Sequence, residues 1–553
     1  MVAAEPAAAG GLLQVQLPAP RARRGNVPRP PPVHREPRPR PGDRRGRPAR
    51  APRRGPPRRL RHRPCPPAAA PRPHPGRGAR RLGAGAVGRA AGDDRHQSPG
   101  AGGPDDRRGR RVIALAAPPG WRGGPGAAPL DGRLPDPPHA AGRSRPAHRR
   151  EDLAAPHPQL HVAVQSLSPK GEPAVALTDE ARNAIADEAW GVAEKIKPSA
   201  ASLDANRAYP GDHLDALAGA GLAGLLIPPE HGGKGGELTS LALACEAVGW
   251  ADGSTGLVHL LPLCGSATIG AKATPEQAEA WLVPAASGDS LATLAFSERA
   301  TGAHFYMPEI KAERSDGGYV LNGKKSFVTS GGHADLYPVL VNASGGEGLD
   351  VLVIQGNDEG VSFTGAWEGI GMTGNSSIEM VLDGVQIPAD RIVGAEGDGQ
   401  ELVFNVVAPT FLIGLAAVNV GIAQAALDDT IQHVKTRKNA GGVLAELPTV
   451  QTEIAEMTIA VEEARALVMT AARAADAGDP AALPLVMQSK IGATETAIDV
   501  TGRAMEACGG LAYSKRLDIE RYWRDGRAGS VMAPTNEVLK QWVGKLQTGL
   551  PLF

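Results

Sequence analysis

The sequence predicts an α+β fold in which a helical region, a strand-rich region and a second helical region follow one another. Apolar residues recur every three or four positions in the outer regions, as in amphipathic helices, whereas the middle alternates as strands do. The strands do not alternate with helices and no GxGxxG motif follows a strand, which argues against a Rossmann sheet. We expect a disordered segment at 1–165, a helical domain at 170–290, a β domain at 291–399 and a helical bundle at 400–553.

Residues 1–165 of the 553-residue chain have an unusual composition, rich in Arg, Pro, Ala and Gly. There is no lysine before Lys170, no tyrosine before Tyr209 and no phenylalanine before Phe296. So few large apolar side chains cannot offset the entropy of ordering a backbone, and dense proline blocks helices, so we expect disorder. A basic tether is one interpretation of the arginines. Translated upstream sequence of a GC-rich genome is the simpler one, and the segment shows neither a secretory signal nor a transit peptide.

The first helical region is expected to begin with Thr178 as the N-cap of the stretch "DEARNAIADEAWGVAEKIK". Helices then continue to about Trp281. Paired glycines and two prolines in "LAGLLIPPEHGGKGG", residues 222–236, predict a loop that interrupts them.

Strands are expected from Leu291 to about Gly399. The stretch "GYVLNGKKSFVTSG" predicts two strands joined by a hairpin turn at Asn322–Gly323. "DVLVIQG" and "SSIEMVLDGVQIP" are further candidate strands. Helices return after Gln400, with one long amphipathic stretch at 408–435 and two more segments that begin near 450 and 484.

Cysteine usage and hydropathy exclude several classes of protein. Cys65, Cys245, Cys264 and Cys508 are widely spaced and form no CxxC pair, so neither a disulfide framework nor a zinc site is indicated. A reducing cytoplasm is the simplest compartment. Apolar runs such as "LALACEAVGW" are too short to span a bilayer, and we expect neither a membrane span nor a nucleic-acid partner in the globular part.

Several motifs in one order resemble the acyl-CoA dehydrogenase family from about residue 177 to 545. They are "GLAGLLIPPEHGGKGG", "LAFSERATGA", "NGKKSFVTSGGHAD", "GIGMTGNSSIEMVLDGVQIPADRIVG", "VGIAQAALDDTIQHVKTRK", "ACGGLAY" and "ERYWRDGRAG". The resemblance implies a helical domain, a β-barrel-like middle domain and a four-helix bundle. It also implies an FAD-dependent oxidoreductase that acts on the CH–CH group of an acyl-CoA thioester, and a place in fatty acid metabolism.

The resemblance implies a set of residues that would contact FAD. Alternation along one strand places Phe327 and Thr329 on the same face. By resemblance Phe327 would cover the isoalloxazine and Thr329 would bond its N5 edge. Small residues near Ser297 would let the backbone approach the pyrophosphate. The full implied set is Leu294, Phe296, Ser297, Gly302, Ala303, Phe327, Val328, Thr329, Arg437, Gly509, Gly510, Thr535 and Glu537.

Three of these positions would serve the FAD of a partner subunit in the family. They are Arg437, which would pair with phosphates, and the Gly509–Gly510 pair, which would permit close approach. A homodimer or homotetramer is therefore implied, with a hetero-oligomer also open. The structural alternatives are that the two glycines end a helix and that the arginine is a solvated surface charge.

The catalytic carboxylate of the family has no counterpart at its usual positions. The reaction needs a base within hydrogen-bond reach of the substrate α-carbon. The register of "YWRDGRAGSVMAPTNE" places Ala533 at the usual glutamate, and the second position that some members use falls on Phe411, beside Leu412. The catalytic residue is therefore unknown. Glu506, beside the glycine pair, and Glu537, one turn beyond Ala533, are remote candidates.

Other acidic and basic side chains near the motifs have structural interpretations. Asp525 and Glu298 match family carboxylates that form ion pairs, and His304 and His333 are more often surface or hydrogen-bonded residues. Two alternative functions remain open at this point. One is a flavin monooxygenase on the same fold, which would use O2 and need no such base. The other is a non-catalytic partner subunit. The electron acceptor would be a flavoprotein or O2.

Overall fold

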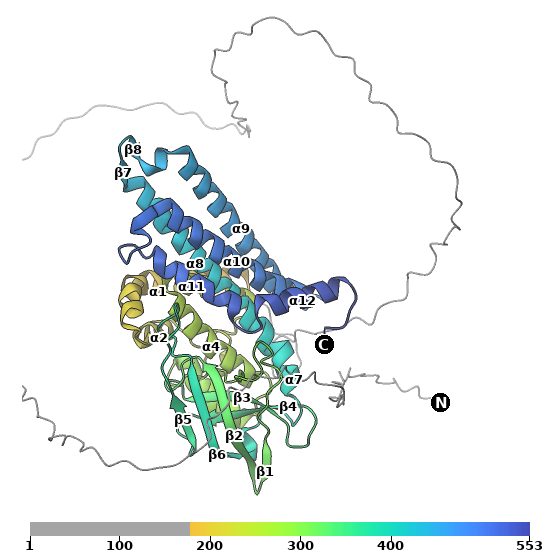
Figure 1. Cartoon of the computed structure of the whole chain (residues 1–553). Coiled ribbons are helices and arrows are strands. Elements are labelled where there is room, and N and C mark those ends of the chain that lie inside the picture. Colours follow the sequence, from red (N-terminus) through yellow and green to blue (C-terminus); the bar gives the residue numbers. More distant parts are fainter. Residues whose placement is uncertain (1–176, 553) are drawn as a thin grey trace, which may run out of the picture. The chain divides into compact units, whose positions relative to one another are not determined.

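The computed structural model describes residues 177–552. The disorder expected for residues 1–165 lies outside the described residues. Within them, helices at both ends of the chain surround a strand-rich middle, so the α+β fold is confirmed (Figure 1).

The N-terminal region consists of helices. The side chain of Thr178 accepts a hydrogen bond from the backbone N–H of Ala181 at 3.2 Å, so the predicted N-cap is present. The predicted loop at 222–236 contains only the short 3-10 helix η1. The elements are α1 (Asp179–Asn206), α2 (Gly211–Gly219), η1 (Pro229–His231), α3 (Leu238–Ala251), α4 (Gly253–Gly270), α5 (Pro275–Gln277), η2 (Ala278–Leu282) and α6 (Val283–Ser287).

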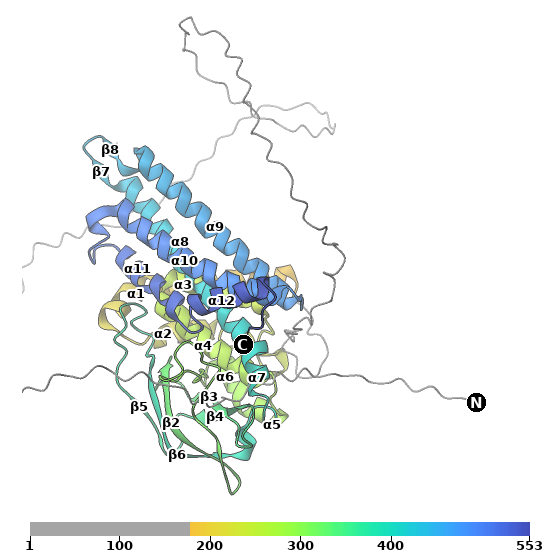
Figure 2. The same ribbon diagram turned by 45° about the vertical axis from the view of Figure 1, so that its right-hand side comes forward.

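The middle region forms two sheets of the barrel-like domain. A four-stranded sheet has the order β1-β2-β6-β5, and β3 pairs with β4 in a second, two-stranded sheet. In Figures 1 and 2 these strands lie together at one end of the described chain, below the long helices. The strands are β1 (Glu313–Ser315), β2 (Gly318–Val328), β3 (Leu336–Asn342), β4 (Leu349–Gln355), β5 (Val361–Thr364) and β6 (Ile378–Pro388).

The prediction of a hairpin turn at Asn322–Gly323 is wrong. Strand β2 continues through both residues and pairs with β6 on either side of them, with a shift of register between Leu321 and Gly323. The site is therefore an irregularity within one strand. Glycine is required there because its φ is 145° and an added Cβ would lie 2.6 Å from the side chain of Ile310.

The C-terminal region is a bundle of long helices, in which α10 packs against α8, α9, α11 and α12 (Figure 2). The short helix η3 (Ala389–Arg391) closes the middle region, directly after β6. The elements that follow are α7 (Gly399–Glu401), η4 (Leu402–Val407), α8 (Ala408–Thr436), β7 (Lys438–Asn439), β8 (Gly442–Val443), η5 (Leu444–Glu446), α9 (Pro448–Asp476), α10 (Ala482–Cys508), η6 (Gly509–Leu511), α11 (Ile519–Val531) and α12 (Asn536–Gln547).

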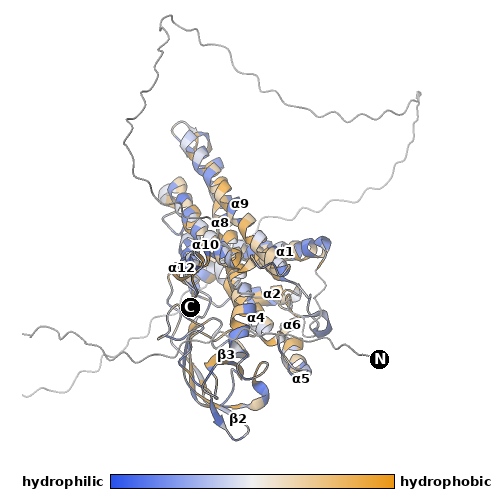
Figure 3. Cartoon of the chain, turned by 90° about the vertical axis from the view of Figure 1, so that its right-hand side faces the viewer, coloured by the Kyte–Doolittle hydropathy of each residue, from blue (hydrophilic) through white to orange (hydrophobic). Residues whose placement is uncertain are grey.

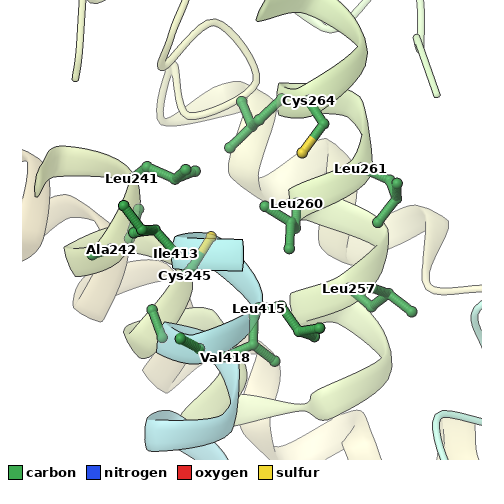
Figure 4. Close-up of a cluster of buried hydrophobic side chains, with 14 of the residues drawn as sticks. Leu241, Ala242, Cys245, Leu257, Leu260, Leu261, Cys264, Ile413, Leu415 and Val418 are labelled. Atoms are coloured by element: carbon green, nitrogen blue, oxygen red, sulfur yellow. The ribbon is translucent and has the colours of Figure 1, made fainter. Parts of the chain in front are cut away.

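Helices α3, α4 and α8 form the main hydrophobic core, whose buried side chains include Cys245, Cys264 and Ile413 (Figure 4). Figure 3 shows the apolar character of α4 and α8. The run from Gly399 to Thr436 is long and apolar enough to cross a membrane, but 89% of its most apolar window is buried inside the protein. Its hydrophobicity is therefore explained by its place in the core.

Candidate functional site

A cavity of about 1030 Å³ lies where the β domain meets the helical regions. This volume is at the upper end of the usual range for ligand sites. Its walls come from helices α4, α8 and α11, the end of β2, the loop between β5 and β6, and segment 532–535. Figure 4 shows two of its apolar residues, Leu257 and Leu261, on the face of α4 that points away from Cys245.

Eight of the residues predicted to contact FAD line this cavity. Val328 does not, because its side chain is 1% exposed and belongs to the core of the β domain. Arg437, Gly509, Gly510 and Glu537 also lie outside the lining. The eight are Leu294, Phe296, Ser297, Gly302, Ala303, Phe327, Thr329 and Thr535.

Phe327 and Thr329 share the cavity, although the strand is irregular at this point. Strand β2 ends at Val328 after a shift of register, and Phe327 has a φ of 55°. A positive φ is uncommon for a residue with a bulky side chain and marks local strain. The ring of Phe327 is 68% exposed and meets Trp367 edge to face, with 6.4 Å between ring centroids. The strain therefore accompanies an aromatic ring that is left open to the cavity.

Thr329 is held in place by its neighbours. Its hydroxyl lies 2.9 Å from that of Ser377, and its carbonyl accepts a hydrogen bond from Thr293 at 2.9 Å. The side chain is almost completely buried, so its hydroxyl faces the cavity from a fixed position.

The segment from Leu291 to Ser297 runs beside β3 without forming a regular strand. Isolated parallel bridges join Ala292 to Leu336 and Ala295 to Val339. The loop that follows contains Gly302, which has a φ of 55° and no atom within 4 Å of an added Cβ. The loop thus leaves open space beside its backbone, as a phosphate cradle requires.

The residues expected to reach a partner subunit are on the surface. Arg437 is exposed at the C-terminal end of α8. Gly509 and Gly510 are exposed at the end of α10, where Gly509 has a φ of 64°. Gly509 is therefore the C-cap of α10, as the structural alternative holds. That capping role does not conflict with contact to a second subunit.

Both positions for a family base face the cavity without a carboxylate. Ala533 lines the cavity, and so does Phe411 on α8. Leu412 points instead into the hydrophobic core, where it is 3% exposed. The wall opposite the β domain is therefore apolar at these two points.

Three carboxylates occur among the described residues that line the cavity. Glu298 is buried and binds the ammonium of Lys325 at 2.6 Å, as its structural interpretation predicts. It also accepts the backbone N–H of Glu309 at 2.8 Å. Glu379 pairs with Lys324 at 2.9 Å. Glu368 is exposed and has no ion pair within the part of the chain that the structure describes.

The two remote candidates for a base are both exposed and outside the cavity lining. Glu506 lies on the last turns of α10, and Glu537 is on the first turn of α12 with its carboxylate 3.5 Å from Lys540. Neither is placed to take a proton from a ligand in the cavity. The two histidines form structural contacts: His304 lies 3.0 Å from the Tyr306 hydroxyl, and His333 stacks on Tyr209.

Sequence reasoning missed Arg524 and misjudged the contacts of Asp525, two side chains that hold the cavity walls. Arg524 lines the cavity and is bound by Asp204 and Glu520. The ion pair expected for Asp525 is wrong: among residues 177–552 this buried carboxyl group forms none and instead accepts the backbone N–H of Met372. Burial raises the pKa of Asp525 to about 7. A charged residue within an apolar helix face is the sequence signal that could have drawn attention to such positions.

The three regions each match one domain of a single family. The acyl-CoA dehydrogenase N-terminal domain matches residues 179–289, the middle domain 293–385 and the C-terminal domain 413–546.

Curated relatives and solved structures agree with this match. The cyclohex-1-ene-1-carbonyl-CoA dehydrogenase of Geobacter metallireducens is 32% identical over 355 residues, which are 64% of this chain and 93% of the relative. The short-chain specific acyl-CoA dehydrogenase of Clostridium acetobutylicum is 30% identical over 352 residues, 63% of this chain and 92% of the relative. The butyryl-CoA dehydrogenase of Megasphaera elsdenii has a similar structure with a TM-score of 0.64 and 28% identity, covering 68% of this chain and 99% of that one.

Proposed function

Since the chain belongs to the acyl-CoA dehydrogenase family, we propose that its cavity binds FAD and carries out the α,β-dehydrogenation of an acyl-CoA thioester. The observation that carries this proposal is the convergence of eight predicted flavin contacts on one cavity of about 1030 Å³. The relatives named above are dehydrogenases, and this favours dehydrogenation over a monooxygenase or a non-catalytic subunit.

The residues present fit FAD. The exposed ring of Phe327 offers a stacking surface, the hydroxyl of Thr329 offers a hydrogen bond, and the open backbone at Gly302 leaves room for a pyrophosphate. When bound, FAD supplies the acceptor for the hydride that leaves the β-carbon.

The chain's own residues would bind and orient the acyl group. Leu257, Leu261 and Phe411 give one side of the cavity an apolar surface that excludes water from an acyl chain. Arg299 and Arg527 also line the cavity, and neither has an ion pair among residues 177–552. Such guanidinium groups suit the phosphates of a CoA ester or of the cofactor.

The α-proton needs an acceptor that this wall does not provide. A methyl group at Ala533 cannot bind a proton, and Glu298 and Glu379 are engaged by lysines. The third lining carboxylate, Glu368, belongs to the loop between β5 and β6 and not to this wall, and its side chain is exposed to solvent. We infer that the proton passes to a water molecule or a small carboxylate that enters the space beside Ala533. Dehydrogenation is then slower than in a protein with a carboxylate fixed at this position, by the factor of about 10²–10⁴ that a positioned base contributes.

The remaining parts of the proposal concern partners and place. We infer that the reduced flavin passes its electrons to an electron-transferring flavoprotein or to O2. Arg437 and the Gly509–Gly510 pair would complete the FAD site of a second copy in a homodimer or homotetramer. The compartment we propose is the cytoplasm.

Anaerobic reduction of the full-length flavoprotein tests the proposed reaction. The visible spectrum is recorded before and after mixing with acyl-CoA esters of increasing chain length. Bleaching of the flavin by a thioester, with formation of the enoyl-CoA, is the expected result. Bleaching by NADH alone, followed by an O2-dependent product, would instead indicate a monooxygenase. A protein that purifies without flavin and does not take up added FAD would indicate a non-catalytic subunit.

A further inference from the structure

Lys490 is a buried lysine whose three oxygen neighbours all belong to one short segment of the chain. Its side chain is 0% exposed on α10. Its Nζ donates to the carbonyl of Pro534 at 3.1 Å and to Oδ1 of Asn536 at 2.9 Å, and lies 3.4 Å from the carbonyl of Met532. One ammonium group therefore ties segment 532–536 to α10 at three points.

That segment is a wall of the cavity. Met532, Ala533, Pro534 and Thr535 all line it, and they connect α11 to α12. Two of their carbonyl groups are directed to Lys490, behind the wall. The lysine itself is not part of the lining, so it can act on a ligand only through the segment it holds.

Burial of the Lys490 side chain costs free energy of desolvation, which its hydrogen bonds must offset. A buried ammonium normally requires a carboxylate partner. Among the described residues Lys490 forms no ion pair, and Glu495, five residues further along α10, pairs with Lys540 at 2.6 Å. Burial lowers the pKa of Lys490 to about 7. Within residues 177–552, the acceptors that compensate the desolvated donors are the oxygens of segment 532–536.

Asn536 extends the attachment. Its Nδ2 donates to the Thr494 hydroxyl at 2.9 Å, so α10 holds the start of α12 with two side chains one helical turn apart. A hydrogen-bonded buried network of this kind fixes a single backbone conformation.

We propose that Lys490 is a positioning residue for the cavity, whose buried side-chain amine fixes segment 532–536 so that Ala533 and Thr535 keep their places in the wall that meets FAD and substrate. Its consequence for turnover rests on the proposed function. The attachment of segment 532–536 to α10 does not depend on that function, and hydrogen exchange can measure it without any reaction.

Two measurements on full-length K490M test this proposal. Methionine has a similar shape and removes all three donors. Hydrogen exchange of peptides covering residues 531–540 should become at least about tenfold faster, and the dissociation constant for FAD should rise by at least about tenfold. Exchange in α8 and α9 should stay as in the wild type. The matched control is K540M, which removes a surface lysine that joins the same two helices and should change neither quantity.

Unchanged exchange in 531–540, or an equal acceleration throughout α8–α12, would overturn the positioning role. If K490M does not fold, N536A decides, because it removes one of the three acceptors and should give the same local acceleration to a smaller degree. The outcome of the hydrogen-exchange measurement does not depend on the proposed function. A chain that fails to oxidise any acyl-CoA but shows local loosening in K490M refutes the reaction and supports Lys490.

Discussion

Asp525 on α11 accepts a hydrogen bond of 2.6 Å from the backbone N–H of Met372, in the loop between β5 and β6. Met372 has a φ of 47°, a conformation that a non-glycine residue adopts only where its surroundings hold it. The loop also supplies Trp367 and Ile370 to the cavity. A carboxyl group in the helical bundle therefore fixes a loop of the β domain that lines the cavity.

The pH dependence of stability should report this carboxyl group. Burial raises the folded-state pKa of Asp525 to about 7, well above the ordinary value for an aspartate side chain. The folded state therefore binds the proton more tightly, and this stabilisation is complete below about pH 4 and is lost as pH rises to about 7. Between pH 4 and 7 the wild type should lose roughly 2–4 kcal/mol relative to D525N, which keeps an acceptor for Met372 but does not titrate.

Thermal unfolding at a series of pH values measures this difference. D525A serves as the control, because it removes the acceptor and should be less stable than D525N at every pH by about 1–3 kcal/mol. Parallel curves for the wild type and D525N would show that Asp525 does not titrate in this range.

A carboxylate restored at position 533 should accelerate dehydrogenation. In A533E the new side chain would start from the cavity wall, and the rate of flavin bleaching by an acyl-CoA should rise by about 10²–10⁴. A533Q has the same size without a base and should not be faster than the wild type. Acetate or formate should partly replace the missing group in the wild type and give a saturable increase. Equal rates for A533E and A533Q would contradict this account of the cavity.

The flavin surface offered by Phe327 gives a third prediction. The ring is 68% exposed, so F327A should leave the thermal stability of the apoprotein within about 0.5 kcal/mol of wild type. The dissociation constant for FAD should rise about tenfold, since an aromatic stack contributes roughly 0.5–1.5 kcal/mol beyond its buried area. F327W keeps the stack and should bind FAD as the wild type does. An FAD titration followed by fluorescence compares the three proteins, and equal affinities would exclude Phe327 as a contact.

Local patterns in the sequence predicted the order of helices and strands well, because amphipathic periodicity and caps such as Thr178 act over a few residues. The hairpin predicted at Asn322–Gly323 was wrong because the residue pair Asn-Gly is typical both of hairpin turns and of irregularities within a strand. Only the pairing of both halves of β2 with β6, more than fifty residues away, distinguishes them. Such pairing is absent from local sequence.

Eight of the cavity-lining residues were predicted through motifs, but the contacts that support the cavity walls were not. Phe327 and Thr329 share the cavity through a strained, irregular strand end, whereas simple alternation was the expected reason. Lys490 and Asp525 occur in helical segments where burial depends on which helix packs against which. Lys490 contacts Pro534, 44 residues further along the chain, and Asp525 contacts Met372, 153 residues before it. Local sequence patterns do not indicate such long-range contacts.

The buried ion pair between Lys325 and Glu298 supplies a last prediction. Lys325 is 0% exposed, and it binds Glu298 at 2.6 Å and the carbonyl of Leu340 at 2.5 Å. Removal of one partner leaves the other charge buried, so K325M should lower the free energy of unfolding by about 3–5 kcal/mol. K325M/E298Q removes both charges and should recover part of the loss, because Gln can still accept the N–H of Glu309. Denaturant unfolding of the three proteins measures the coupling, and equal stability of the single and double variants would show that the two side chains do not compensate each other.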